Sequence, residues 1–127
     1  MEEEMTPQVI KIGMLFSPEI VAVPAEADAD YSGPVMRDPV LVAKSVDALL
    51  AASGTIALEQ SRVTTWNTHD TGCSLSSAIT AELAKGAPLE GPAGRAQVWL
   101  HGAICAADDR AIGGGHGPVH HFHGYWP

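Results

Sequence analysis

The segment Asn67–Ala78 constrains the fold of this chain more than any other part of the sequence. It reads Asn-Thr-His-Asp-Thr-Gly-Cys-Ser-Leu-Ser-Ser-Ala, which predicts a short loop followed by a helix with Cys73 in its first turn. Free backbone N–H groups and the helix dipole favour a bound anion at a helix start, and a thiol held there is favoured as thiolate. An anion site that coincides with a base suits phosphoryl transfer to a hydroxyl group. The same residues also fit a plain helix cap with a buried, inert cysteine.

Three further blocks accompany this segment in a fixed order. They are Val9–Leu15, Asp38–Ser45 and Gly115–His123. They read Val-Ile-Lys-Ile-Gly-Met-Leu, Asp-Pro-Val-Leu-Val-Ala-Lys-Ser and Gly-His-Gly-Pro-Val-His-His-Phe-His. Together with the first segment, they resemble the hydroxymethylpyrimidine/phosphomethylpyrimidine kinases of thiamine biosynthesis, a family of the ribokinase-like superfamily. The resemblance covers most of the chain and is weakest at residues 1–8 and 54–60.

The resemblance implies both a fold and a reaction. The fold class is α/β, as a partial ribokinase-like three-layer α/β/α sandwich with a mostly parallel sheet. The reaction is the phosphorylation of 4-amino-5-hydroxymethyl-2-methylpyrimidine, or of its monophosphate, with ATP and Mg²⁺. The expected partners are therefore the pyrimidine and ATP. An alternation of strand-like and helix-like segments independently favours the same α/β class.

The resemblance also assigns roles to individual residues. Cys73 takes the place of the catalytic base, and the backbone of Thr71, Gly72 and Cys73 forms an anion hole for the transferred phosphoryl group. Met14 and Val40 correspond to apolar contacts with the pyrimidine ring, and both also fit an ordinary core.

Two polar residues of the second block have open roles. Asp38 follows an expected strand, where the sites of α/β proteins gather, so it is a candidate for magnesium or phosphate geometry. An Asp before Pro is equally a common turn former. Lys44 either meets a phosphate or is an ordinary surface lysine.

The sequence departs from the family pattern at several places. Family members are considerably longer. By comparison with them, pieces are missing before Val9 and between Leu50 and Arg62. In the family, the second of these pieces contains elements linked to magnesium and the nucleotide. Asp70 stands where the family usually has glycine, and an acidic side chain beside a phosphate site opposes anion binding. We therefore expect a kinase with activity impaired by truncation. The alternative is a non-catalytic oligomeric α/β fragment that retains anion or pyrimidine binding.

Composition narrows the class of protein. The chain has 127 residues, enough for one small domain, and a net charge of −8, which argues against a general nucleic-acid or anionic-membrane surface. No apolar run is long enough to span a bilayer, and no signal peptide is recognised, so the cytoplasm is the expected location. The two cysteines, Cys73 and Cys105, do not make a disulfide framework. Because Cys105 lies in an expected packed helix, we expect Cys73 to alkylate faster.

Residue patterns predict the order of the elements. We expect strands at residues 8–15, 34–37 and 62–66, and helices from Ser17 toward Asp30, at 44–50, at 71–85 and at 88–107. The first helix should break or kink at Pro24, and residues 53–55 should form a loop. The helix at 71–85 has the clearest signal, because apolar residues recur at helical spacing and Gly86 supplies a stop.

The chain is expected to divide into three parts. A flexible acidic tail occupies residues 1–8, a partial ribokinase-like domain residues 9–112, and a structureless Gly/His-rich tail residues 113–127. The histidines of this tail are candidate metal ligands, namely His116, His120, His121 and His123. Their pattern belongs to the family's C-terminal block and lacks a zinc spacing with cysteine, so adventitious nickel or zinc binding is the favoured interpretation.

A shortened sheet has a consequence for assembly. It leaves strand edges and an apolar face uncovered, and these favour contact with another chain. We therefore expect a homo-oligomer, most simply a dimer.

Overall fold

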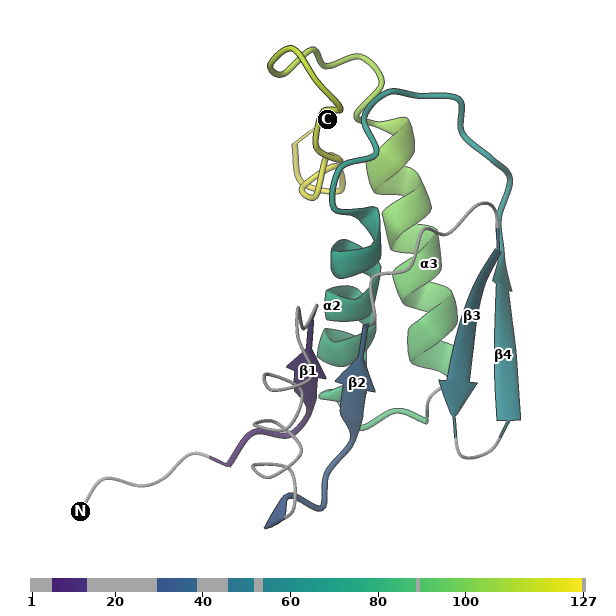
Figure 1. Cartoon of the computed structure of the whole chain (residues 1–127), viewed down its shortest axis with the longest axis vertical. Coiled ribbons are helices and arrows are strands. Elements are labelled where there is room, and N and C mark those ends of the chain that lie inside the picture. Colours follow the sequence, from purple (N-terminus) through teal and green to yellow (C-terminus); the bar gives the residue numbers. More distant parts are fainter. Residues whose placement is uncertain (1–5, 14–29, 39–45, 52–53, 89, 127) are drawn as a thin grey trace, which may run out of the picture.

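The computed structural model describes residues 6–13, 30–38, 46–51, 54–88 and 90–126. Within these ranges the elements follow in the order β1 (Ile10–Ile12), β2 (Val35–Arg37), β3 (Val46–Ala51), β4 (Gly54–Glu59), α2 (Thr71–Leu83) and α3 (Glu90–Cys105). The two helices lie side by side, with β1 and β2 against α2 and with β4 against α3 (Figure 1). The described chain is therefore an α/β fold built around a helix pair.

The described strands form two separate pairs. β1 and β2 are parallel, with Ile10 opposite Val35. β3 and β4 form an antiparallel hairpin, with Val46 opposite Glu59. Gly54 opens β4 with a φ of 133°, a conformation that residues with a side chain rarely adopt. The expected parallel pairing is thus present in the first pair, whereas the second pair is a hairpin that the sequence did not predict.

The helix pair forms most of the core. The buried apolar residues that pack together are Leu58, Leu75, Ile79, Ala93, Ala96, Leu100, Ala103 and Val119. Four members of this cluster lie on α3, namely Ala93, Ala96, Leu100 and Ala103. They recur at spacings of three and four, which places them on one face of the helix. Three of these four residues are alanines, so α2 can approach α3 closely. The helices predicted at 71–85 and 88–107 are both confirmed, with slightly shorter bounds.

Two local predictions are wrong. Residues 46–51 form strand β3 instead of the expected helix at 44–50. A helix of that length is marginal in isolation, whereas pairing with β4 satisfies the backbone groups on the facing edges of both strands. Residues 62–65, expected as a strand, have no regular structure. Instead, the hydroxyl oxygen of Thr65 accepts a hydrogen bond from the N–H of Asn67 at 3.1 Å.

Smaller differences concern element bounds. The strand predicted at 34–37 is confirmed as β2, and the strand predicted at 8–15 is seen as the shorter β1. Gly54 and Thr55, expected in a loop, already belong to β4. The expected helix from Ser17 and its break at Pro24 lie outside the described residues.

The C-terminal segment packs against the helix pair. The sequence predicted a structureless tail, and residues 113–126 indeed contain only turns and an isolated bridge between Pro118 and His69. However, Val119 is buried in the core, and the N–H of His120 donates to the carbonyl oxygen of Ala103 at 2.9 Å. The segment lies beside the start of α2 and the end of α3 (Figure 1). It is therefore part of the folded structure.

In the part of the chain that the structure describes, no helix combines the length and the apolar character needed to cross a bilayer.

Candidate functional site

The start of α2 presents backbone N–H donors that have no acceptor within the helix. The first hydrogen bond of the helix runs from the N–H of Ser74 to the carbonyl oxygen of Asp70, at 2.9 Å. The N–H groups of Thr71, Gly72 and Cys73 precede it and so have no acceptor within the helix. The positive end of the helix dipole lies at the same place. This arrangement is the backbone geometry that an anion hole requires.

Asp70 is the residue that precedes the helix. Its φ of 58° puts it in the left-handed region, the only such value among the described residues other than glycine. Its side chain makes no capping hydrogen bond, and a carboxylate oxygen lies 3.1 Å from Nε2 of His69. Glycine adopts this conformation without steric cost, whereas aspartate does not. Asp70 therefore adds both backbone strain and a negative charge beside the expected anion site.

The two cysteines have different surroundings. Both are free thiols; Cys73 is half-buried in the first turn of α2, and Cys105 is exposed at the end of α3. The expectation that Cys105 is packed is therefore wrong. Its sulfur lies 3.9 Å from Nδ1 of His101, one helical turn earlier.

Asp38 reaches the same helix from the sheet. It directly follows β2, and its backbone N–H donates to Ile12 at 3.0 Å, which continues the pairing with β1. The hydroxyl of Ser76 lies 2.9 Å from Oδ2 of Asp38 and 3.1 Å from the carbonyl oxygen of Cys73. The structure thus brings Asp38 to the first turns of α2. The other expected site residues, Met14, Val40 and Lys44, lie outside the described residues.

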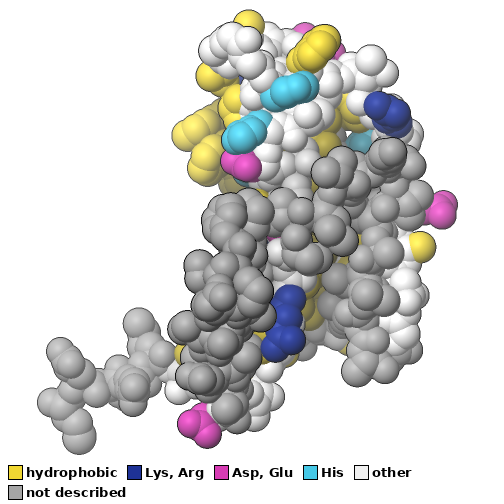
Figure 2. All heavy atoms as spheres, in the orientation of Figure 1, with side chains coloured by type: hydrophobic (Ala, Val, Ile, Leu, Met, Phe, Trp, Pro, Cys, Tyr) yellow, Lys and Arg dark blue, Asp and Glu magenta, His cyan; other side chains and the backbone are white. Residues whose placement is uncertain are grey.

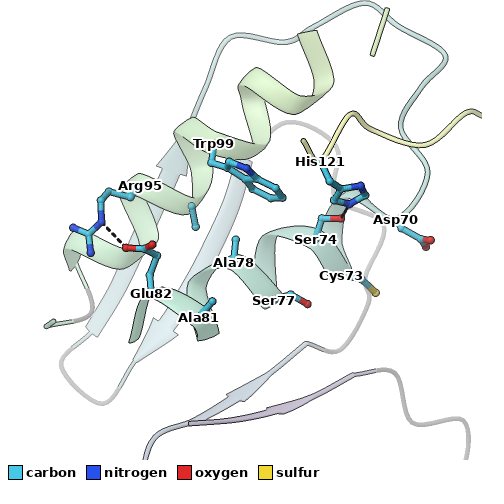
Figure 3. Close-up of a pocket in the computed structure, with 11 residues that line it drawn as sticks. Asp70, Cys73, Ser74, Ser77, Ala78, Ala81, Glu82, Arg95, Trp99 and His121 are labelled. Carbon is cyan, nitrogen blue, oxygen red and sulfur yellow. Dashed lines mark hydrogen bonds and ion pairs between the residues drawn. The ribbon is translucent and has the colours of Figure 1, made fainter. Parts of the chain in front are cut away.

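An open groove of about 790 Å³ runs between α2 and α3 from this helix start. Its lining includes Cys73, Ser77 and Ala81, which recur every four residues on α2, and the indole of Trp99 on α3 (Figure 3). Sequence reasoning missed this groove. The four-residue spacing of small side chains was the available signal, but only the packing against α3 shows which face is lined.

Polar pairs mark the two ends of the groove. Near the start of α2, Oγ of Ser74 hydrogen-bonds Nε2 of His121 at 2.8 Å. At the other end, Nε of Arg95 donates to the carboxylate of Glu82 at 2.7 Å (Figure 3). The hydrogen bond from Lys85, followed by that from Arg95, lowers the pKa of Glu82 below its usual value. This end of the groove therefore holds a glutamate that both cations favour in its charged form.

The four histidines of the C-terminal segment bind different partners. His116 donates to the carbonyl oxygen of Trp66 at 3.2 Å, and His120 to that of Trp126 at 2.6 Å. His123 donates to the carbonyl oxygen of His120 at 3.2 Å. Figure 2 shows histidine side chains beside apolar ones at the upper end of the molecule. Within the described ranges, no three His, Cys, Asp or Glu side chains are placed to hold a metal ion.

Comparison with known proteins identifies the family. Two stretches of the chain, residues 1–60 and 45–120, match the family model described as phosphomethylpyrimidine kinase. The chain belongs to the phosphomethylpyrimidine kinase family. The match confirms the resemblance read from the four sequence blocks.

Individual members of the phosphomethylpyrimidine kinase family show how much of a relative is matched. The hydroxymethylpyrimidine/phosphomethylpyrimidine kinase of Rhizobium meliloti is 47% identical over 83 residues, which are 65% of this chain and 31% of that enzyme. The Escherichia coli enzyme of the same name is 39% identical over 83 residues, with the same coverage. The thiamine biosynthesis multifunctional protein ThiED of Corynebacterium glutamicum is 38% identical over 78 residues, 61% of this chain and 10% of that protein. The matched part thus spans about a third of the Rhizobium meliloti and Escherichia coli enzymes.

A solved structure shows the fold. The Bacillus subtilis pyridoxal kinase, determined as an ADP complex, matches with a TM-score of 0.54 and 22% identity, over 94% of this chain and 50% of that chain. This likeness, together with the parallel pair of strands, confirms the α/β fold class.

Proposed function

We propose that this chain carries the phosphoryl-transfer part of a hydroxymethylpyrimidine/phosphomethylpyrimidine kinase site of thiamine biosynthesis. Its substrates would be ATP and the hydroxymethylpyrimidine or its monophosphate. Membership of the family supports the reaction class. The observation that carries the proposal is the start of α2, where three N–H groups with no acceptor within the helix and the Cys73 thiol share one helical turn.

Each group at this helix start has a role in the proposed transfer. The substrate hydroxyl oxygen attacks the γ-phosphorus of ATP, its proton passes to the sulfur of Cys73, the proposed base, and the bond from the γ-phosphorus to ADP breaks. Negative charge spreads over the phosphoryl oxygens during this step. The N–H groups of Thr71, Gly72 and Cys73 would stabilise that charge, because they are already oriented and need no reorganisation.

Asp38 is the described residue that fits a magnesium ion. Its carboxylate offers the hard oxygen ligands that Mg²⁺ prefers, and Ser76 holds it beside the first turns of α2. When bound, Mg²⁺ neutralises charge on the ATP phosphates. Met14 and Val40 keep their proposed contacts with the pyrimidine ring, which rest on the family resemblance. Lys44 remains a candidate phosphate contact, with an ordinary surface lysine as the alternative.

A second function is favoured by the length that is matched. Because the matched part spans about a third of the relatives, it leaves out most of what those enzymes contain. The chain would then bind a phosphate or a pyrimidine without turning it over. The groove between α2 and α3 and the N–H groups at the start of α2 support this second proposal.

One set of measurements separates these two functions. Calorimetric titration with magnesium–ATP and, separately, with the pyrimidine alcohol measures binding, and ³¹P NMR measures phosphorylation. A kinase should bind both and form phosphorylated product, and Cys73→Ala should abolish product while Cys105→Ala, at the exposed thiol, leaves it unchanged. Binding without product supports the second function. Binding of neither ligand contradicts both.

A further inference from the structure

The loop before α2 is held by a segment that follows it by almost fifty residues in the sequence. The N–H of His69 donates to the carbonyl oxygen of Gly117 at 3.1 Å, and His69 forms a parallel bridge with Pro118. At the beginning of the loop, Nδ1 of His116 donates to the carbonyl oxygen of Trp66 at 3.2 Å, and the two rings lie 5.6 Å apart. Backbone and side-chain contacts therefore join the two segments along their length.

The same segment also reaches the first turn of the helix. Nε2 of His121 hydrogen-bonds Oγ of Ser74 at 2.8 Å, and Ser74 is the residue whose N–H makes the first hydrogen bond of α2. Between these contacts Val119 is buried in the core. The segment is thus anchored in the core and contacts both the loop and the helix start.

Asn67 provides the closest fit between the two segments. It is buried, with 8% of its surface exposed, and its Nδ2 donates to the carbonyl oxygens of Arg110, at 2.9 Å, and Ala107. Its Oδ1 lies against Gly117, where a Cβ atom would stand only 2.0 Å from it. Oδ1 belongs to an amide group whose nitrogen makes two hydrogen bonds, so the oxygen has little freedom to move away.

We propose that the segment His116–His121, called the clasp below, positions the loop Trp66–Asp70 and thereby aims the N–H groups at the start of α2. Asp70 is held in the left-handed region, and such strained backbone persists only where its surroundings determine it. The clasp supplies those surroundings. Asn67, Gly117 and His121 are positioning residues, and only their consequence for phosphate binding rests on the proposed function.

Small displacements matter at such a site. Donors that stabilise a phosphoryl group must hold their positions to within about 0.5 Å. No described helix or strand contains the loop, so its conformation depends on contacts with other segments. The clasp and, through Asn67, the segment that follows α3 provide these contacts.

Gly117→Ala tests the clasp, with Gly114→Ala as the matched control. The methyl group at position 117 would collide with Asn67, whereas a Cβ at position 114 meets no atom within 4 Å. The measurement is amide hydrogen exchange at His69, compared with the core helical amide of Leu100. Gly117→Ala should speed exchange at His69 about tenfold relative to Leu100, because an overpacked methyl shifts a local equilibrium by that order. Gly114→Ala should leave both rates unchanged.

A double variant tests the collision itself. In an Asn67→Ala background the obstructing oxygen is gone, so adding Gly117→Ala should produce no further increase in exchange. Exchange at His69 that is unchanged by Gly117→Ala, or that rises equally at Leu100, would overturn the proposal. So would equal effects of Gly117→Ala in the presence and absence of Asn67.

A ligand measurement then separates the clasp from the kinase proposal. Inorganic phosphate is the probe, and protection of Cys73 from iodoacetamide is the signal. Gly117→Ala should raise the half-protecting phosphate concentration several-fold over that of Gly114→Ala, whereas a purely structural role would lower thermal stability alone. If the unchanged chain shows no phosphate protection, the anion site fails, and the exchange rates still decide the clasp.

Discussion

Asp70 is where backbone geometry and charge oppose the proposed site together. The residue stands in the left-handed region, which costs less for glycine than for other residues. Its carboxylate is exposed and pairs with His69 at 3.1 Å. Neither feature helps to bind a phosphate. Substitution at this one position therefore separates strain from electrostatics.

We predict that Asp70→Gly strengthens phosphate binding. Removing a like charge beside the anion is worth on the order of 1 kcal/mol, or about fivefold in affinity. Asp70→Asn is the matched control, since asparagine tolerates the same backbone conformation and removes only the charge. If charge is the cause, both variants should bind phosphate more tightly in calorimetry. Unchanged affinity in both would show that the anion does not bind at this helix start.

The two thiols provide a second prediction at the residue scale. Cys105 is exposed and Cys73 is half-buried, so a bulky aromatic disulfide reagent should modify Cys105 first. The effect of phosphate should be the opposite: saturating phosphate should slow alkylation at Cys73 and leave Cys105 unaffected. Peptide mass analysis reads both sites in one sample, so Cys105 serves as the internal reference. Equal slowing at both sites would indicate a general salt effect.

At the scale of elements, the link between α2 and α3 includes an ion pair that depends on pH. Arg95 on α3 and Lys85, just after α2, both donate to Glu82. Their hydrogen bonds, that of Lys85 first, lower the pKa of Glu82 in the folded chain. The carboxylate therefore binds its proton less readily in the folded state than in the unfolded state. Its contribution to stability is present above the ordinary glutamate pKa of 4.5 and is lost as the pH falls below that value.

We predict that Glu82→Gln lowers the free energy of unfolding slightly at about pH 6 and lowers it less at about pH 3. The effect is small because the pair lies at the surface. Urea unfolding followed by circular dichroism measures it at both values. Glu59→Gln, at an exposed position on β4, is the control. A loss of stability for Glu82→Gln that is the same at both pH values would mean that packing is responsible.

The helices could be predicted from local sequence, whereas one of the strands could not. α2 and α3 could be predicted, because apolar spacing and the glycine after α2 are local signals. Strand β3 could not be predicted in the same way. Its residues become a strand through pairing with β4, and nothing within residues 46–51 specifies that partner. Residues 62–65 show the opposite case. Their Val and Thr content favours a strand, but they form none in the structure.

The candidate site likewise combines features that lie within one segment with contacts between segments far apart in the sequence. The helix start and Cys73 could be predicted from one continuous segment. The contact of Asp38 with Ser76 spans 38 residues, and that of Ser74 with His121 spans 47. Contacts over such separations leave no periodic signal in the sequence. The resemblance to a family named the reaction class, but the role of the C-terminal segment became visible only in the structure.

At the scale of the whole molecule, exposed edges and aromatic side chains bear on assembly. Each described strand pairs with one neighbour, so among the described residues both small sheets have unpaired edges, and such edges favour pairing with another chain. Large aromatic side chains are also exposed near the end of the chain, among them Tyr125 at 83% and Trp126 at 62%. Uncovered strand edges and apolar groups of this kind favour self-association.

We predict that the chain forms a homodimer through the edge of the β3–β4 hairpin. Thr55→Lys combined with Ala57→Lys places charge on exposed positions of β4 and should shift the protein toward monomer, because charged side chains oppose edge pairing. Thr64→Lys, an exposed position in the loop that follows β4, is the control and should leave the dimer intact. Light scattering coupled to gel filtration measures the mass of each variant. A folded monomer of the unchanged chain at high micromolar concentration would contradict the dimer. A dimer that survives both lysines would instead place its interface elsewhere, and the exposed aromatic residues near the C-terminal end would be the next surface to alter.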